Sequence, residues 1–142
     1  MELAGICLAL LGAAGAGSGE PVFVQAERFT LAWTHSIEKV RWEEDYAVLP
    51  GPGPREPPIL QALTARVRGS GAGMEPPPDA RLVNGWYEYT PSIRHPVELR
   101  LTRSGFTADF DWCADGRCRP LSSLLPSDGG VTLLTACRSP KP

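Results

Sequence analysis

Apolar residues recur at every second position along much of the chain. This alternation is clearest in five segments, at residues 29–33, 40–48, 63–67, 97–101 and 106–112. A side-chain period of two is typical of strands in antiparallel sheets that have one buried and one wet face. No segment carries the sustained i, i+3, i+4, i+7 stripe of an amphipathic helix. The best helical candidate, residues 121–125, is barely longer than one turn.

Turn-forming residues separate these segments at short intervals. They are Asn84-Gly85, Ser104-Gly105, Asp115-Gly116, Gly129-Gly130 and two longer stretches rich in Pro and Gly at 50–58 and 69–78. Short strands punctuated in this way are typical of sandwiches and small barrels. We therefore predict an all-β fold, an antiparallel β-sandwich or small barrel, with little or no helix beyond the N-terminal leader. A chain of 142 residues is enough for one such domain.

The first sixteen residues, MELAGICLALLGAAGA, follow a different pattern. A short apolar run followed by small residues is typical of a secretory signal peptide, and the run is too short for a permanent membrane anchor. The segment departs from that pattern in one respect, because Glu2 is its sole charged residue and no Lys or Arg precedes the apolar run. We predict a signal-peptide-like segment at 1–16, a single all-β domain at 17–142, and a periplasmic or secreted protein.

Overall charge argues against one large class of partner. The formal net charge is −2 and the isoelectric point is about 5.7, whereas nucleic-acid binding calls for a basic face. The glycine-rich stretch at 69–73 is not followed by the helix that a phosphate-binding loop requires, because three prolines come soon after it. We expect no nucleic-acid partner, no nucleotide site and no cofactor.

Two cysteines flank a hairpin signal. Cys113 and Cys118 enclose Asp115-Gly116, a pair typical of a two-residue type I′ turn. Counting outward, the two cysteines face each other at a non-hydrogen-bonded position, where Cα atoms lie roughly 4.5 Å apart, a separation that a disulfide accepts. We predict a Cys113–Cys118 disulfide, with Cys137 unpaired or replacing one of the two. The C-x4-C spacing without a nearby histidine argues against a zinc or redox site.

The segment WTHSIEKVRWEED, at 33–45, contains a break in the alternation. Core-facing positions are odd-numbered up to Trp33 and even-numbered from Val40 onward, so a bulge or tight corner must fall near 37–39. Glu44 then occupies a core-facing position. A buried carboxylate without a partner is costly, and we expect it to meet His35, Lys39 or an arginine.

Three functions are compatible with this segment. A hydrolase would use Ser36 as nucleophile and His35 as base, with Glu38 or Glu44 as orienter, but adjacent strand residues point to opposite faces. A metal site would use His35, Glu38 and Glu44, and His95 is the only further histidine. The third is a buried polar network that is either purely structural or also a contact for a ligand or partner. We favour this third reading, with no catalytic residue and no metal, and expect the contact residues to be His35, Ser36, Glu38, Lys39, Trp42 and Glu44.

Several motifs in order carry a family resemblance. They are W-x-H-S-x-E-K at 33–39 followed by Trp42 and Glu44, GSGAGM at 69–74, an acidic-then-glycine segment at 79–87, W-C…C-x-P-L at 112–121, and Cys137. With these motifs the chain resembles the bacterial domain-of-unknown-function family eighteen-fifty over nearly all of its length after the leader.

The resemblance implies a cellular context rather than a chemistry. Members of the family look like small exported proteins encoded beside tripartite ATP-independent periplasmic (TRAP) transporters, and their molecular activity is unassigned. It therefore implies a monomeric accessory or binding module of a TRAP-type uptake system, whose partner is the membrane or solute-binding subunit of the transporter. A small hydrolase using Ser36, His35 and a carboxylate, or a structural envelope protein, are the alternatives.

Overall fold

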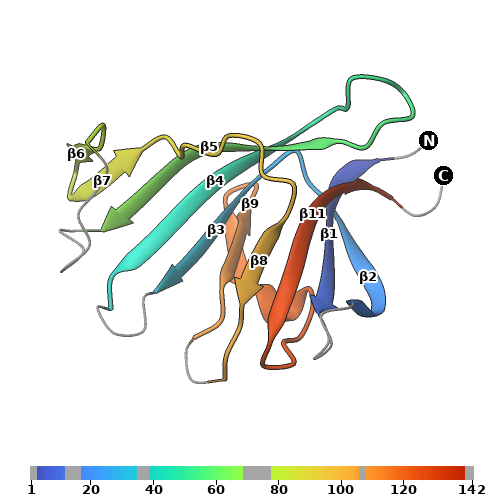
Figure 1. Cartoon of the computed structure of the whole chain (residues 1–142). Helices are drawn as coiled ribbons and strands as arrows, with labels where there is room; N and C mark the ends of the chain where they lie inside the picture. Colours follow the sequence, from blue (N-terminus) through green and yellow to red (C-terminus); the bar gives the residue numbers. More distant parts are fainter. Residues whose placement is uncertain (1–2, 12–16, 35–38, 69–77, 106–107, 140–142) are drawn as a thin grey trace.

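The chain folds into two antiparallel sheets that pack face to face (Figure 1). The computed structural model describes residues 3–11, 17–34, 39–68, 78–105 and 108–139. The strands found there are β1 (Ala4–Leu11), β2 (Gly17–Gln25), β3 (Arg28–Thr34), β4 (Arg41–Leu49), β5 (Ile59–Arg68), β6 (Arg81–Val83), β7 (Trp86–Tyr89), β8 (Leu99–Thr102), β9 (Asp111–Ala114), β10 (Arg117–Pro120) and β11 (Val131–Arg138), with one 3-10 turn, η1 (Leu121–Ser123). The predicted all-β sandwich is confirmed.

The smaller sheet has the strand order β2-β1-β11-β8 and includes the N-terminal segment. Strand β1 lies between β2 and β11, and its residues Ile6 and Leu8 are fully buried. Residues of the predicted leader thus form a central strand of this sheet, and the boundary expected at residue 17 stays a prediction. An apolar run of this length fits a signal-peptide core and a buried central strand equally well, and its pattern alone does not separate the two.

The larger sheet has the strand order β10-β9-β3-β4-β5-β7-β6. Strands β3 and β4 pair antiparallel from Arg28↔Ala47 to Thr34↔Arg41, so the chain reverses direction between Thr34 and Arg41. This agrees with the corner that the parity break predicted, although residues 35–38 lie outside the described part of the chain.

The core lies between the sheets, at the predicted positions of β3 and β4. Phe29 stacks on Trp112 with ring centroids 4.5 Å apart and on Tyr46 at 5.3 Å. Leu31 of β3 and Leu134 of the smaller sheet are fully buried in the same cluster. Burying one such side chain stabilises the fold by about 1.5–3 kcal/mol, so this cluster dominates the packing of the sandwich.

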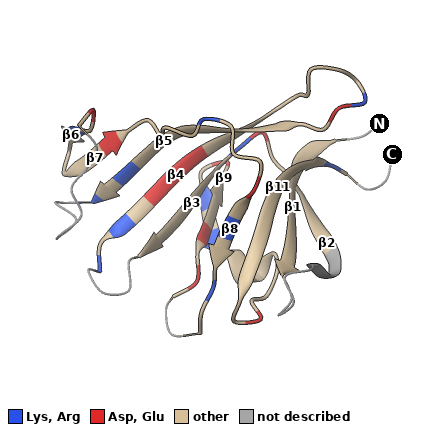
Figure 2. Cartoon of the chain, in the orientation of Figure 1, with Lys and Arg blue, Asp and Glu red and all other residues tan. Residues whose placement is uncertain are grey.

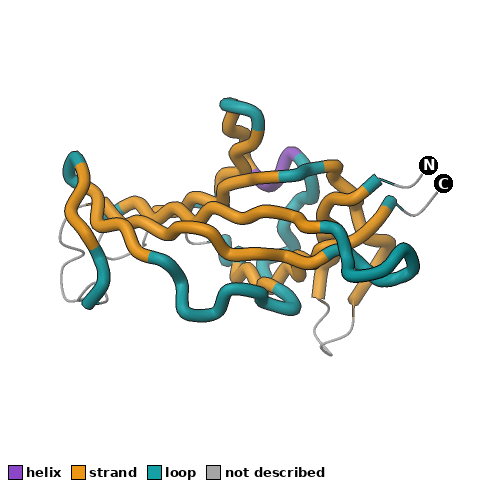
Figure 3. Tube along the Cα trace, turned by 90° about the horizontal axis from the view of Figure 1, so that it is seen from above, coloured by secondary structure: helices purple, strands orange, loops and turns teal. Residues whose placement is uncertain are grey.

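The sheets overlap over only part of the larger one. From the front and from above, the end of the larger sheet that carries β6 and β7 extends past the smaller sheet (Figures 1 and 3). The inner face of the larger sheet is therefore covered by β1 and β11 at one end and opens toward β7 at the other.

Both tight hairpins have the predicted turn chemistry. Asn84-Gly85 joins β6 to β7 with φ of 51° and 86°, and Asp115-Gly116 joins β9 to β10 with φ of 54° and 76°. Two successive positive φ values are the signature of a type I′ turn.

The cysteines form two disulfides. Cys113 and Cys118 are cross-strand partners with Cα atoms 4.0 Å apart, which confirms the predicted pairing. The expectation for Cys137 was wrong, because Cys137 pairs with Cys7 across the β1/β11 ladder, with Cα atoms 5.9 Å apart. The prediction failed because Cys7 was assigned to a leader outside the domain.

Candidate functional site

Two cavities lie on opposite faces of the larger sheet. One, of about 480 Å³, lies on the inner face, between β3 and β4 on one side and β8 on the other. The other, of about 740 Å³, lies on the outer face beside the β9/β10 hairpin. They differ in chemistry, and each is described in turn.

The inner pocket has apolar walls and one carboxylate. The apolar side chains come from both sheets and from the segment before β9, and they are Leu31, Trp33, Leu99, Leu101, Ala108 and Phe110. Among the described residues of its lining Glu44 of β4 is the sole acidic one, and Arg100 is exposed and paired with Glu98 at 2.7 Å. Apolar pockets with few polar groups are the usual form of small-molecule sites.

Strand alternation places Glu44 in this pocket. It is paired across the sheet with Leu31 of β3 and Ala65 of β5, which are both fully buried. Residues two apart on a strand share a face, so Trp42 and Tyr46 lie on the same side of β4 as Glu44. The inward orientation of Glu44 that the sequence indicated is present in the structure.

A tyrosine, rather than a cation, is the partner of this carboxylate. The Tyr46 hydroxyl donates a hydrogen bond to Glu44 Oε1 at 2.7 Å. Among the described residues Glu44 has no ion pair, so neither Lys39 nor an arginine neutralises it there. Sequence reasoning missed the contact because Tyr46 was counted only as a core residue, although a buried tyrosine hydroxyl usually needs a partner.

Burial dominates the electrostatics of this cluster. It raises the pKa of Glu44, because an apolar surrounding disfavours the charged form, while the Tyr46 hydrogen bond acts in the opposite direction. Burial and then the charge of Glu44 raise the pKa of Tyr46, so its hydroxyl remains a donor. The pKa of Tyr89, from β7, is raised by the same two causes.

Aromatic rings line the pocket beside Glu44. The rings of Trp33 and Trp42 are nearly parallel, with centroids 6.2 Å apart. The rings of Trp33 and Phe110 have centroids 5.6 Å apart, and their planes are inclined by 53°. The Trp42 indole nitrogen is buried without a hydrogen-bond acceptor in the described part of the chain. Trp33 and Phe110 thus line the pocket together with Glu44, and Trp42 stacks on Trp33.

A buried ion pair fixes the segment that carries Phe110. Arg103 is 2% exposed and donates to Asp109 from Nε at 2.9 Å and from Nη2 at 2.8 Å, and to the Thr132 hydroxyl at 3.0 Å. Burial raises the pKa of Asp109, but the hydrogen bonds and charge of Arg103, together with hydrogen bonds from the backbone of Phe110 and Ser122, outweigh it and leave that pKa lowered. The expected strand at 106–112 begins as regular strand only at Asp111, because residues 108–110 cross between the sheets. Residues 106–107 lie outside the described part.

The remaining predicted contact residues are only partly placed. Lys39 is exposed and has a φ of 58° just before β4. His35, Ser36 and Glu38 lie outside the described residues, so the hydrolase and metal arrangements stay untested. Among the residues that the structure describes, no group of His, Cys, Asp or Glu is placed to hold a metal ion. The same part of the chain has no helix with the length and apolar character needed to cross a membrane.

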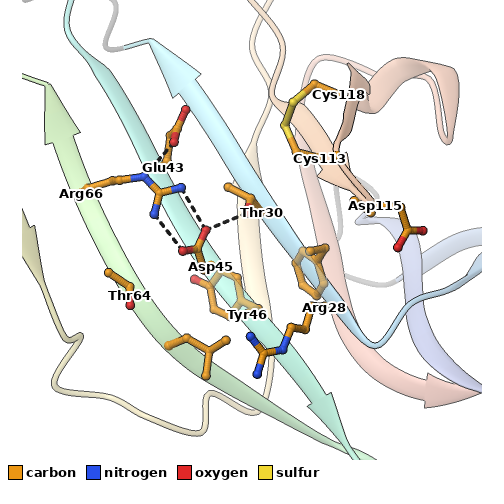
Figure 4. A pocket seen from close by; sticks show the side chains of 14 residues that line it. Arg28, Thr30, Glu43, Asp45, Tyr46, Thr64, Arg66, Cys113, Asp115 and Cys118 are labelled. Carbon is orange, nitrogen blue, oxygen red and sulfur yellow. Dashed lines mark hydrogen bonds and ion pairs between the residues drawn. A yellow bond between two sulfur atoms is a disulfide. The ribbon is translucent and has the colours of Figure 1, made fainter. Parts of the chain in front are cut away.

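The outer cavity is lined by a charge network that sequence reasoning did not single out. Arg66 of β5 donates to Glu43 at 2.8 Å and to Asp45 at 2.8 Å, and the Thr30 hydroxyl donates to Asp45 at 2.6 Å (Figure 4). Strand β4 carries both acidic residues of this network and, at its start, Arg41, while Arg66 lies on the neighbouring β5 (Figure 2). The available signal was the outward half of the same alternation, which carries Arg41, Glu43 and Asp45. Because these carboxylates are already paired, the network mainly orders the sheet surface.

Comparison with known families supports the resemblance. Residues 29–121 match the family described as Domain of unknown function (DUF1850), a match that covers more than half of the chain and extends from β3 to η1. The chain belongs to this family of uncharacterised β domains. No curated protein and no solved structure matches it.

Proposed function

We propose that this domain is a binding module that holds a small ligand in the inner pocket, as an exported accessory of a TRAP-type uptake system. The observation that carries the proposal is the pocket itself, about 480 Å³ of space to which the described residues contribute aromatic and aliphatic walls and a single acidic side chain. Pockets of 300–1,000 Å³ with mainly apolar linings and a few placed polar groups are typical of small-molecule binding.

The position of Glu44 favours binding over a purely structural role. Its strand neighbours across the sheet, Leu31 and Ala65, are apolar and fully buried, and a hydrophobic side chain would pack there without a desolvation cost. A carboxylate in that place, bonded to one tyrosine, costs stability. Such a cost is typical of groups retained for function.

Two features support the cellular part of the proposal. The family resemblance implies a gene context beside TRAP transporters, and we therefore propose the membrane or solute-binding subunit as the partner. The two disulfides fit an oxidising compartment, because such bonds persist in the periplasm or outside the cell. Both the family resemblance and the disulfides are compatible with an exported protein that keeps residues 4–11 as strand β1.

Ligand binding is tested by screening a library of small, mainly apolar compounds against the oxidised full chain by thermal shift. Hits are then titrated calorimetrically against wild type and Leu101→Trp, which fills the pocket from the β8 side. We expect hits whose binding falls at least tenfold in Leu101→Trp. Arg66→Gln, on the outer face, is the matched control and should bind as wild type does. Hits that lose affinity only in Arg66→Gln would contradict the proposal.

Partnership is tested separately by a pull-down. The tagged chain is incubated with membranes that carry the neighbouring transporter, and recovery of the membrane subunit on the affinity resin is compared with recovery in the absence of the tagged chain. Equal recovery with and without the tagged chain, or none in either case, would overturn a direct contact without affecting the pocket.

A further inference from the structure

We propose that the ligand of the inner pocket is a small organic cation, an amine or quaternary ammonium, held between the Glu44 carboxylate and the rings of Trp33 and Phe110. This inference rests on the proposed binding function and names the chemical class that the pocket accepts. Three features of the described residues carry it. They are the Glu44 carboxylate without an ion-pair partner, the aromatic side chains of the wall, and the ion pair that already engages Arg100.

The first feature is the hydrogen-bonding of the carboxylate. Oε1 of Glu44 accepts from the Tyr46 hydroxyl at 2.7 Å, and Oε2 has no donor among the described residues. A tyrosine contributes one proton and no charge, so the carboxylate lacks a neutralising partner. A buried carboxylate is stabilised by an opposite charge far more than by a neutral donor, which makes a bound cation the complementary occupant.

The second feature is the wall beside the carboxylate. Trp33 and Phe110 both line the pocket, with centroids 5.6 Å apart and planes inclined by 53°. Both rings thus belong to the wall of the same pocket as Glu44, and a cation within about 6 Å of the face of an aromatic ring is attracted to it. Trp42 lies parallel behind Trp33 at 6.2 Å and fixes the orientation of that ring.

The third feature disfavours the opposite class of ligand. Arg100 is the sole basic residue that the described part of the chain contributes to the lining, and its Nε donates to Glu98 at 2.7 Å while its side chain is 64% exposed. An anion would therefore meet Glu44 without gaining a free arginine. A neutral ligand would cover the partly buried carboxylate without supplying an opposite charge.

The test compares ligands of one shape and different charge. Choline, its uncharged carbon isostere dimethylbutanol, and the anion dimethylbutanoate are titrated calorimetrically into the oxidised full chain at alkaline pH. We expect choline to bind at least tenfold more tightly than dimethylbutanol, and dimethylbutanoate to bind most weakly. Equal or tighter binding of dimethylbutanol would overturn the cation assignment. The same outcome would leave the pocket itself intact as a binding site.

Variants locate the preference. Glu44→Gln should abolish the preference for choline over dimethylbutanol, and Trp33→Leu should reduce that preference. Glu27→Gln, which removes the same charge from an exposed position outside the pocket, is the control and should retain it. Thermal melting of each variant establishes that it folds. Unchanged choline binding in folded Glu44→Gln would overturn the inference, as would a failure of all three compounds to bind wild type. Loss of all binding together with failure of the library screen would instead remove the proposed function.

Discussion

Glu44 is the residue for which the sequence pattern predicted the orientation of the side chain but not its hydrogen-bond partner. Its orientation could be predicted, because strand alternation assigns each position to one face. Its hydrogen-bond partner could not be predicted. Tyr46 lies two residues further along the same strand, and the alternation pattern treats it as an apolar core residue. The alternation of apolar and polar residues does not reveal the Tyr46 hydroxyl, yet this hydroxyl donates the hydrogen bond that Glu44 accepts.

The raised pKa of Glu44 makes stability depend on pH. A carboxyl whose folded pKa lies above its unfolded value keeps its proton longer when folded, so stability falls as pH rises from the unfolded value of about 4.5 through the folded one. Other groups facing this carboxylate are Tyr46, Tyr89 and, at the pocket edge, Arg100. We expect urea unfolding to show wild type losing stability relative to Glu44→Gln across that range. A constant difference between the two proteins from acid to neutral pH would contradict this assignment.

Arg103 is the residue whose loss should cost most at the pocket wall. Removing one partner of a buried ion pair leaves an uncompensated charge, and Arg103→Met should lower the unfolding free energy by about 3 kcal/mol. Arg100→Met, at an exposed pair, is the control and should cost less than about 1 kcal/mol. Denaturant titration measures both. Similar losses in the two variants would show that the Arg103–Asp109 pair does not hold the segment before β9.

At the scale of elements, the sequence was informative where local chemistry decides the structure. Asp115-Gly116 predicted its hairpin and its disulfide, and the alternation at 40–48 predicted β4 and its inward face. The sequence was uninformative where the structure depends on a contact between residues far apart in the chain. Strand β1 is distinguished from a signal peptide only by pairing with β11, more than a hundred residues away in sequence, and by the Cys7–Cys137 bond with its separation of 130 residues.

Strand β1 supplies a direct test of the domain boundary. A chain that begins at residue 17 lacks the fully buried Ile6 and Leu8 and exposes both neighbouring strands, β2 and β11. We expect this truncated chain to lose cooperative thermal unfolding, monitored by circular dichroism, whereas the full chain retains it. A truncated chain that unfolds cooperatively at the same temperature would support the signal-peptide prediction instead.

The two disulfides should differ in what they contribute. In the loop-entropy account a bridge across 130 residues contributes about 5 kcal/mol, and one across 5 residues about 2 kcal/mol. The double variant Cys7→Ser/Cys137→Ser should therefore unfold at a clearly lower urea concentration than Cys113→Ser/Cys118→Ser. The reverse order would mean that the hairpin bridge, not the bridge between the terminal strands, limits stability.

At the scale of the whole molecule, the larger sheet separates two surfaces of different chemistry. Its outer face carries paired charges, and its inner face carries an apolar pocket with one carboxylate. Sequence alternation predicts both faces of each strand, but the pocket also needs β8 and the crossing segment at 108–110. Strand β8 and residues 108–110 belong to a distant part of the chain. The pocket therefore could not be predicted from the alternation within single strands.

The central claim, that the inner pocket is the binding site, is tested most directly by nuclear magnetic resonance. Choline is titrated into uniformly labelled oxidised protein, and backbone and indole shifts are followed. The account predicts shifts concentrated at Leu31, Trp33, Glu44 and Leu101, with saturation. Shifts concentrated instead at Thr30, Asp45 and Arg66 on the outer face, or no saturable shifts, would contradict it.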